Sequence, residues 1–201
     1  MINLPEPIKK FTAKFSRLPG IGPRQATRLA FYLINKEKNE AGEIGGAVLG
    51  LEKIKICENC FFVHQNKGNL CDICEDKNRN QKSIAIVEKE TDLLSLENTA
   101  KFNGRYLVLG QINRSGILED WQKKRLENFK ESIKNNFGGK ADEIILALSP
   151  SRYGDFSASI LLKELKPYAV KISRLGRGLP VGSEIEFADE ETLGEALKNR
   201  S

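Results

Sequence analysis

The cysteines of this chain have the spacing of a metal site. All four lie within one stretch of 18 residues, as Cys57-x2-Cys60-x10-Cys71-x2-Cys74. Each Cys-x2-Cys pair places two thiolates on one tight turn, and two such turns close a tetrahedron of sulfur around one Zn²⁺. Four protein ligands leave no position for a reactive water. The pattern therefore predicts a structural zinc in a small metal-stabilised module.

Two alternatives to this ligand set stay open at the level of the sequence. Two disulfides would suit a secreted protein, but residues Met1–Pro5 show no apolar signal segment, so we expect a reducing, cytoplasmic setting. His64, the only histidine, lies between the two cysteine pairs and is able to replace one thiolate.

No run approaches the roughly 18 apolar residues of a membrane span, so no membrane partner is expected.

Positive charge is concentrated in the N-terminal quarter of the chain. The net charge is +5, and residues 1–56 contain ten lysines and arginines against five acidic residues. A local basic excess predicts a polyanionic partner, most often nucleic acid, although lysine-rich surfaces also serve solubility.

A Pro-Gly-Ile-Gly-Pro turn interrupts two amphipathic patterns in this basic region, which predicts two helices joined by a hairpin. Pro23 suits the first turn of the second helix. Gly20 and Gly22 allow a tight turn and expose N–H groups beside a helix N-terminus, which favours a phosphate oxygen. Arg24 and Arg28 lie four residues apart on one helical face and are predicted to contact the DNA backbone.

This segment resembles the helix-hairpin-helix motif of proteins that bind DNA without reading its sequence. The Leu-Pro-Gly-Ile-Gly core of that motif is present at residues 18–22. The alternative is a generic helical hairpin in which the glycines serve only the turn. We expect sequence-nonspecific binding, since no set of base-reading side chains on a recognition helix is evident.

Beyond the cysteines, short apolar runs alternate with helical patterns. Strands are expected at residues 83–88, 106–110, 143–149 and about 170–175, and helices at residues 91–97, about 119–136 and about 155–165. This alternation predicts a mostly parallel sheet covered by helices. Binding sites in such sheets gather at the carboxyl ends of the strands, where Glu88 and the loop 149–155 are expected.

The layout resembles the Toprim domain of topoisomerases and primases, in which a glutamate follows the first strand and an Asp-x-Asp follows a later one. Glu88 stands at the glutamate position, but the later motif reads Tyr153-Gly154-Asp155. At most two Mg²⁺-binding carboxylates remain, so we expect no catalysis. The plainer alternative is that Glu88 caps a helix or pairs with a basic residue.

The order of these modules resembles the RecR family of bacterial recombination mediators. The family's Arg-Gly-Leu-Pro-x-Gly segment is present at residues 177–182, and its acidic Ala-Asp-Glu-x-Thr-Leu stretch at residues 188–193. The chain departs from the family at residues 111–117, where RecR proteins often carry Ser-Pro-Leu-x-Gly, and at residues 153–155, where they tend to carry Glu-Gly-Glu.

The resemblance implies a nucleoid-associated protein of recombinational DNA repair that works with RecO and RecF to promote RecA loading at single-stranded gaps. It also implies a homo-oligomer, a dimer or a tetramer, whose N-terminal and C-terminal regions join into a clamp around DNA. Glu88 and Asp155 then become candidate partner-binding residues. The competing hypothesis is a Mg²⁺-dependent Toprim nuclease or primase-like enzyme that uses the same two carboxylates.

The expected fold class is thus α/β and multi-modular. A helix-hairpin-helix DNA-binding region is expected at residues 1–53 and a four-cysteine zinc finger at residues 54–80. A Toprim-like, mostly parallel domain at residues 81–170 and a C-terminal strand and helix for oligomerisation at residues 171–201 complete the prediction.

Overall fold

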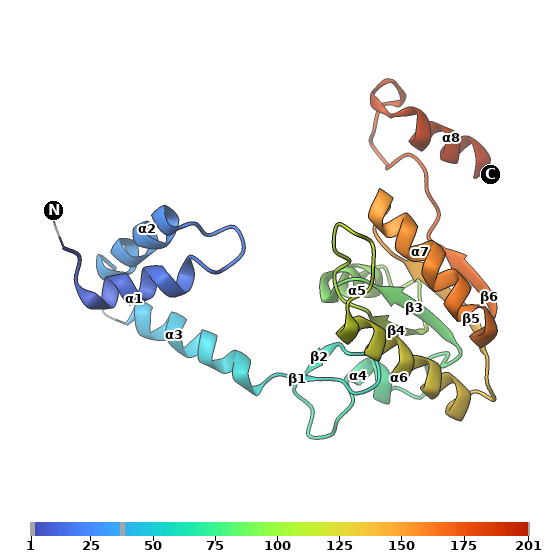
Figure 1. Ribbon diagram of the computed structural model, residues 1–201, viewed down its shortest axis with the longest axis horizontal. Coiled ribbons are helices and arrows are strands. Elements are labelled where there is room, and N and C mark those ends of the chain that lie inside the picture. Colours follow the sequence, from blue (N-terminus) through green and yellow to red (C-terminus); the bar gives the residue numbers. More distant parts are fainter. Residues whose placement is uncertain (1–2, 37–38, 201) are drawn as a thin grey trace. The chain divides into compact units, whose positions relative to one another are not determined.

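The computed structural model describes residues 3–36 and 39–200 (Figure 1). The chain divides into two compact units, Met1–Ile54 and Lys55–Ser201, each of which has its own packing. Among the described residues, none of the helices combines the length and the apolar character that a membrane span requires.

Helices make up the first unit, and two of them are those predicted on either side of the glycine turn. Pro23 is the first residue of the second helix, where its missing N–H costs nothing. A further helix is absent from the predicted elements because its four glycines lower its helix propensity. The elements are α1 (Glu6–Phe15), α2 (Pro23–Ile34), α3 (Glu40–Gly50) and the 3-10 turn η1 (Leu51–Lys53).

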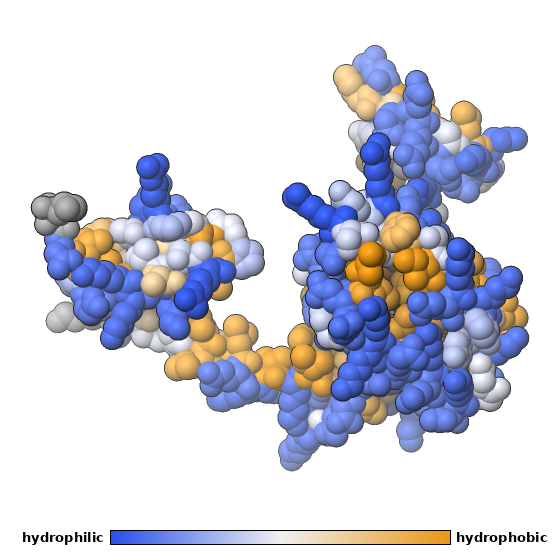
Figure 2. Space-filling model, in the orientation of Figure 1, coloured by the Kyte–Doolittle hydropathy of each residue, from blue (hydrophilic) through white to orange (hydrophobic). Residues whose placement is uncertain are grey.

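An apolar groove of about 470 Å³ lies among the helices of the first unit. Its lining includes Phe11 of α1, Leu33 of α2 and Val48 of α3. No residue of α3 is buried, and hydrophobic atoms follow this helix in the space-filling view (Figure 2). The first unit therefore presents an apolar surface that the described part of the unit leaves uncovered.

The second unit is built on a four-stranded sheet in which every pairing is parallel, as predicted. The strand order is β4-β3-β5-β6, and helices follow three of the strands. The elements are β3 (Ser83–Val87), α5 (Glu90–Asn98), β4 (Arg105–Val108), α6 (Asp120–Asn136), β5 (Ala141–Ala147), α7 (Arg152–Leu165), the 3-10 turn η2 (Lys166–Tyr168) and β6 (Ala169–Arg174).

Side chains alternate between two hydrophobic clusters on the two faces of this sheet. Ile84 and Ile86 of β3 belong to the cluster beneath α6 and α7, whereas Ala85 and Val87 belong to the cluster beneath α5. This is the two-residue period of an extended strand. Because both faces are covered, β3, β4 and the second half of β5 contain apolar runs, which is why these strands were visible in the sequence.

Two helix starts differ from the predicted positions. The helix α7 begins at Arg152 because the Ser151 hydroxyl accepts a hydrogen bond from the Gly154 N–H, at 3.1 Å. The helix α5 begins at Glu90, and Asp92 lies inside it, where its carboxylate accepts the Lys89 N–H at 3.0 Å. Local side-chain contacts fix both starts.

The cysteine module lies along β4, an edge strand of the sheet. The Val108 N–H donates to the Cys60 carbonyl at 2.8 Å, and Arg105 Nη2 donates to the Cys74 carbonyl at 3.1 Å. Phe61 packs against the hydrophobic clusters on both faces of the sheet. The module therefore covers an edge that would otherwise offer unpaired backbone groups. Its elements are β1 (Lys55–Ile56), the antiparallel β2 (Val63–His64) and α4 (Asp72–Glu75).

A polar network fastens the end of this module to the sheet. Arg79 forms an ion pair with Glu97 of α5 and donates to the Gly104 carbonyl at 3.0 Å. The Tyr106 hydroxyl donates to Glu97 Oε1 at 2.7 Å. The Arg79 hydrogen bond, assisted by Tyr106 and opposed by partial burial, lowers the pKa of Glu97.

The chain ends in a segment with little buried surface. It contains the 3-10 turn η3 (Ile185–Phe187) and the helix α8 (Glu190–Lys198), neither of which has a buried residue. Val181 and Phe187 are exposed. The Asn199 side chain donates to the Arg177 carbonyl at 2.9 Å, so a polar contact ties the end of α8 to the preceding loop.

We predict that Glu97→Gln lowers the free energy of unfolding by about 1 to 3 kcal/mol at neutral pH, because Arg79 loses the nearer of its two charged partners, Glu97 and Asp76. Since folding depresses the pKa of Glu97, its contribution is complete above the unfolded pKa of about 4.3 and is lost as pH falls through the folded value. Urea denaturation at several pH values should therefore show the variant and the wild type converging in acid.

The matched control is Asp120→Asn, which removes an exposed ion pair with Lys123 and should cost less than about 0.5 kcal/mol. Equal losses for the two variants, or a difference for Glu97→Gln that does not change with pH, would contradict a structural role for the network.

Candidate metal centre and nucleic-acid interface

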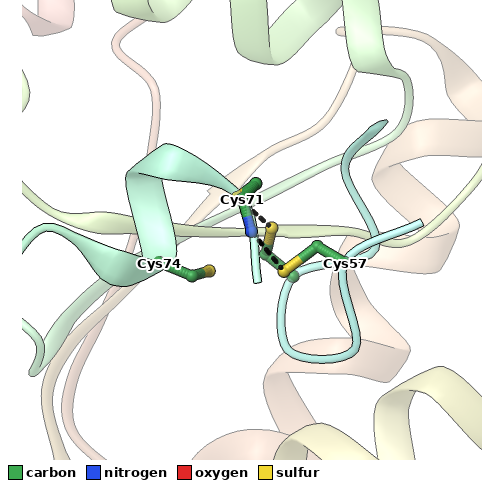
Figure 3. Close-up of side chains that lie close together, drawn as sticks. Cys57, Cys71 and Cys74 are labelled. Carbon is green, nitrogen blue, oxygen red and sulfur yellow. Dashed lines mark hydrogen bonds between the residues drawn. The ribbon is translucent and has the colours of Figure 1, made fainter. Parts of the chain in front are cut away.

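The four cysteines converge in the second unit. Cys57 and Cys60 lie on the turn between β1 and β2, Cys71 precedes α4 and Cys74 lies within it. Their sulfur atoms all lie within 4.8 Å of one another, and all four residues are buried. Figure 3 shows the side chains of Cys57 and Cys74 pointing toward the centre of the cluster from opposite sides. All four cysteines are free, so the alternative of two disulfides is wrong for this structure.

The surroundings of the sulfurs suit a metal ion held by thiolates. The Cys71 N–H donates to Cys57 Sγ at 3.4 Å, and Asn59 Nδ2 donates to Cys74 Sγ at 3.5 Å. N–H donors of this kind stabilise coordinated thiolates and orient them. The four cysteines are therefore positioned to bind one metal ion.

His64 is not one of the metal-ligating groups. It is buried on β2, and its Nδ1 accepts the Asn66 N–H at 3.3 Å. The four cysteine sulfurs lie close enough together to bind one ion, and His64 is not part of this group. The alternative in which His64 replaces a thiolate is thus not supported by the geometry.

Glu88 follows β3 at the carboxyl end of the sheet, as predicted. Its side chain is buried, with 5% of its surface exposed, and Oε1 accepts the Ser149 N–H at 2.8 Å. Ser149 belongs to the loop after β5, so this carboxylate joins the loops that follow two neighbouring strands. Glu88 neither caps a helix nor forms an ion pair among the described residues.

Asp155 lies in the first turn of α7 and is engaged by two arginines. Its carboxylate forms ion pairs with Arg174, the last residue of β6, and with Arg177 in the loop beyond it. Partial burial acts in the opposite direction, but these two ion pairs lower the pKa of Asp155. Within the described residues, the only group of three or more potential metal ligands is the cysteine cluster, so Glu88 and Asp155 do not complete one.

The arginine partners of Asp155 were missed in the sequence, although a signal for them exists. Arg174 lies at the end of the last predicted strand and Arg177 follows that strand, and the carboxyl ends of parallel strands meet at one edge of a sheet. Basic residues after one strand and an acid after its neighbour therefore predict an ion pair at that edge.

The glycine hairpin of the first unit has the predicted form. Gly20 has φ of +77°, a conformation that residues with a Cβ rarely adopt, and Gly22 is the N-cap of α2. A Cβ at either glycine would meet open space, so the backbone there is accessible to a ligand. Arg24 and Arg28 are exposed on α2 one turn apart. The hairpin therefore presents backbone N–H groups and two guanidinium groups to solvent.

Comparison with known families matches the chain in three segments. The model described as RecR, helix-hairpin-helix matches residues 8–49. The model described as Toprim domain matches residues 82–176, and the model described as RecR, C-terminal matches residues 178–201.

Full-length relatives agree with these matches. The Recombination protein RecR of Herpetosiphon aurantiacus is 37% identical over 199 residues, which cover 98% of this chain and 94% of the relative. The protein of the same name from Chloroflexus aggregans is 38% identical, over 96% of this chain and 93% of the relative. The one from Frankia casuarinae is 38% identical, over 93% and 92%. With this identity over nearly its whole length, the chain belongs to the RecR family of recombination proteins.

Proposed function

We propose that this protein is a non-enzymatic, DNA-binding mediator of recombinational repair. It acts as an oligomeric clamp that works with RecO and RecF to promote RecA loading at single-stranded gaps, in the cytoplasm at the nucleoid. The exposed hairpin carries the proposal, since Arg24 and Arg28 follow an accessible glycine turn at the start of α2. Relatives across the whole chain are named as recombination proteins.

The hairpin suits a DNA backbone better than a base sequence. Phosphate oxygens are acceptors for the N–H groups at a helix N-terminus, and the open space beside Gly20 and Gly22 lets a phosphate approach closely. Arg24 and Arg28 add positive charge on the same face of α2. Contacts of this kind position DNA without reading it, as a clamp that moves along DNA requires.

The metal of the cysteine centre is proposed to be a structural Zn²⁺. Zinc supplies a divalent charge and a tetrahedral crosslink that joins the two cysteine pairs. The chain supplies four buried sulfurs, while Asn59 and the Cys71 N–H orient two of them. The set of four thiolates favours zinc over Mg²⁺ or Ca²⁺, which prefer oxygen ligands.

The carboxyl edge of the sheet supports partner binding more than catalysis. The Asp155 carboxylate is already paired with Arg174 and Arg177, and Glu88 is occupied by the Ser149 N–H. We assign Asp155 to the partner-binding surface and Glu88 to the support of the loop behind it. This assignment disfavours the competing hypothesis of a Mg²⁺-dependent enzyme.

Assembly into a clamp is supported by the uncovered apolar surfaces of the two chain ends. The groove among α1, α2 and α3 and the exposed apolar side chains of residues 181–187 are surfaces that a second copy would cover. We accordingly retain residues 1–53 as the DNA-binding region, residues 54–80 as the zinc finger, residues 81–170 as the Toprim-like domain and residues 171–201 as the oligomerisation region.

We predict that replacing Arg24 and Arg28 together by Ala weakens binding to DNA of any sequence. The log-log dependence of affinity on salt should become shallower by about 0.9 for each lost phosphate contact on duplex DNA. Fluorescence anisotropy with labelled duplex and single-stranded oligonucleotides over a range of salt concentrations measures both effects.

The matched control replaces Lys163 and Lys166, two exposed residues of the second unit, by Ala and so makes the same change in net charge. Affinity and slope should stay close to those of the wild type. If the two double variants behave alike, or if the hairpin variant binds as the wild type does, the hairpin is not the DNA-binding site.

Metal removal should lower the thermal stability of the protein, because binding energy at a structural zinc site is also folding energy. Cys71→Ser should reduce the zinc content and destabilise the protein at the same time. Metal analysis with thermal denaturation checks this, and an unchanged melting temperature after complete metal removal would overturn the structural assignment.

Incubation with labelled single-stranded and duplex DNA in Mg²⁺ or Mn²⁺ should yield no cleavage or synthesis above that of a protein-free sample. Glu88→Gln provides the decisive comparison. A divalent-metal-dependent activity of the wild type that disappears in this variant would establish the enzyme hypothesis instead.

A further inference from the structure

An arginine lies between two aromatic rings at the junction of the cysteine module and the sheet. The Arg125 Cζ of α6 lies 4.8 Å from the centroid of the Phe61 ring and 4.8 Å from that of the Trp121 ring. Its Nη1 also donates to the Val108 carbonyl on β4 at 2.9 Å. We call Phe61, Arg125 and Trp121 the aromatic–arginine stack. The planar guanidinium of Arg is well suited to contact both rings at once.

One end of the stack belongs to the metal-binding turn. Phe61 directly follows Cys60 and has φ of +62°, a left-handed conformation that is unfavourable for a residue with a Cβ. The turn imposes this conformation, since the Phe61 N–H donates to the Cys57 carbonyl at 3.0 Å and the Cys57 N–H donates to the Phe62 carbonyl at 2.8 Å. The position of the Phe61 ring therefore depends on the closed form of the turn.

The other end of the stack belongs to the carboxyl end of the sheet. Trp121 lies against Gly110, which follows β4 and has φ of +103°, and a Cβ at Gly110 would lie 1.9 Å from the indole ring. The indole N–H donates to Glu119 Oε2 at 2.7 Å, while 45% of the Trp121 surface stays exposed. A change in the stack would therefore reach the loop that follows β4.

Burial makes the guanidinium depend on these contacts. It lowers the pKa of Arg125, while the charge of Glu90 acts to raise it. Arg125 stays protonated under all ordinary conditions, so its charge needs the two ring faces, the Val108 carbonyl and Glu90 as compensation. If the Phe61 ring moves away, Arg125 loses part of that compensation. The guanidinium that contacts Trp121 is then less firmly held.

We propose that Arg125 is a positioning residue that couples the metal occupancy of the cysteine centre to the conformation of Trp121 and the loop after β4. With metal bound, the turn holds Phe61 over Arg125, and Arg125 holds Trp121 against Gly110. After metal loss, Phe61 returns to a more favourable backbone conformation, its ring leaves Arg125, and Trp121 becomes more exposed. Chelation or oxidation of the centre would thus alter the surface at the carboxyl end of the sheet.

The first test uses the intrinsic fluorescence of the full chain, because Trp121 is its only tryptophan. Emission and acrylamide quenching are recorded for the zinc-loaded protein and after chelation, with metal content measured on the same samples. Circular dichroism identifies conditions in which the sheet stays folded. The expected result is a red shift and stronger quenching after metal loss in the wild type. An unchanged Trp121 signal in folded, metal-free protein would overturn the proposal.

The second test does not require folded metal-free protein, since coupling between two sites is reciprocal. In equilibrium competition with a chromogenic chelator, Arg125→Leu should bind zinc about fivefold more weakly than the wild type, a ratio equal to about 1 kcal/mol at 25 °C. Arg125→Lys keeps the charge but lacks the planar group, so it should restore little of the difference.

The matched control is Lys124→Leu, an exposed neighbour on the same helix, which should bind zinc with the wild-type affinity. Equal zinc affinities for the Arg125→Leu, Lys124→Leu and wild-type proteins would contradict the coupling. The inference rests on the proposed structural metal, but different results would refute each of them. Purified protein that contains no zinc would refute the metal assignment. Zinc-loaded protein in which Arg125→Leu has no effect would refute the coupling alone. DNA binding by the hairpin is measured separately.

Discussion

The convergence of four buried cysteine sulfurs organises the cysteine module of the second unit. Thiolates within 4.8 Å of one another repel strongly in a buried site unless a metal compensates their charge. The surrounding elements are too short to hold the cluster unaided, because β1 and β2 have two residues each and α4 has four. Three partly buried apolar residues pack against the cluster, namely Phe62, Leu70 and Ile73. On the proposed assignment, the bound metal contributes much of the module's stability.

The position of this module along β4 links the metal centre to the rest of the second unit. Cys60 and Cys74 offer backbone carbonyls to Val108 and Arg105, so two of the four clustered cysteines also pair with the edge strand. Arg125 of α6 donates a hydrogen bond to the Val108 carbonyl on the same edge strand. The module therefore protects the sheet edge and at the same time connects the metal to the loop at its carboxyl end.

Much of this arrangement could be predicted from the sequence, and what could not depends on contacts between distant residues. Cysteine spacing predicts the cluster, and apolar runs predict the parallel sheet, because both signals are local and strong. The helix α3 was not predicted because its glycines lower its helix propensity. The engagement of Asp155 by Arg174 and Arg177 is set by the order of the strands, and the left-handed conformation of Phe61 is set by the turn, so neither is visible in residue type alone.

Hydrogen exchange at the Val108 amide tests most directly whether the metal module braces the sheet. This amide donates to the Cys60 carbonyl, whereas amides of β5 pair inside the sheet with β3 and β6. Comparison of zinc-loaded and metal-free protein should show faster exchange at Val108 after metal loss, with β5 remaining protected. Equal protection of Val108 in the two states would contradict the account.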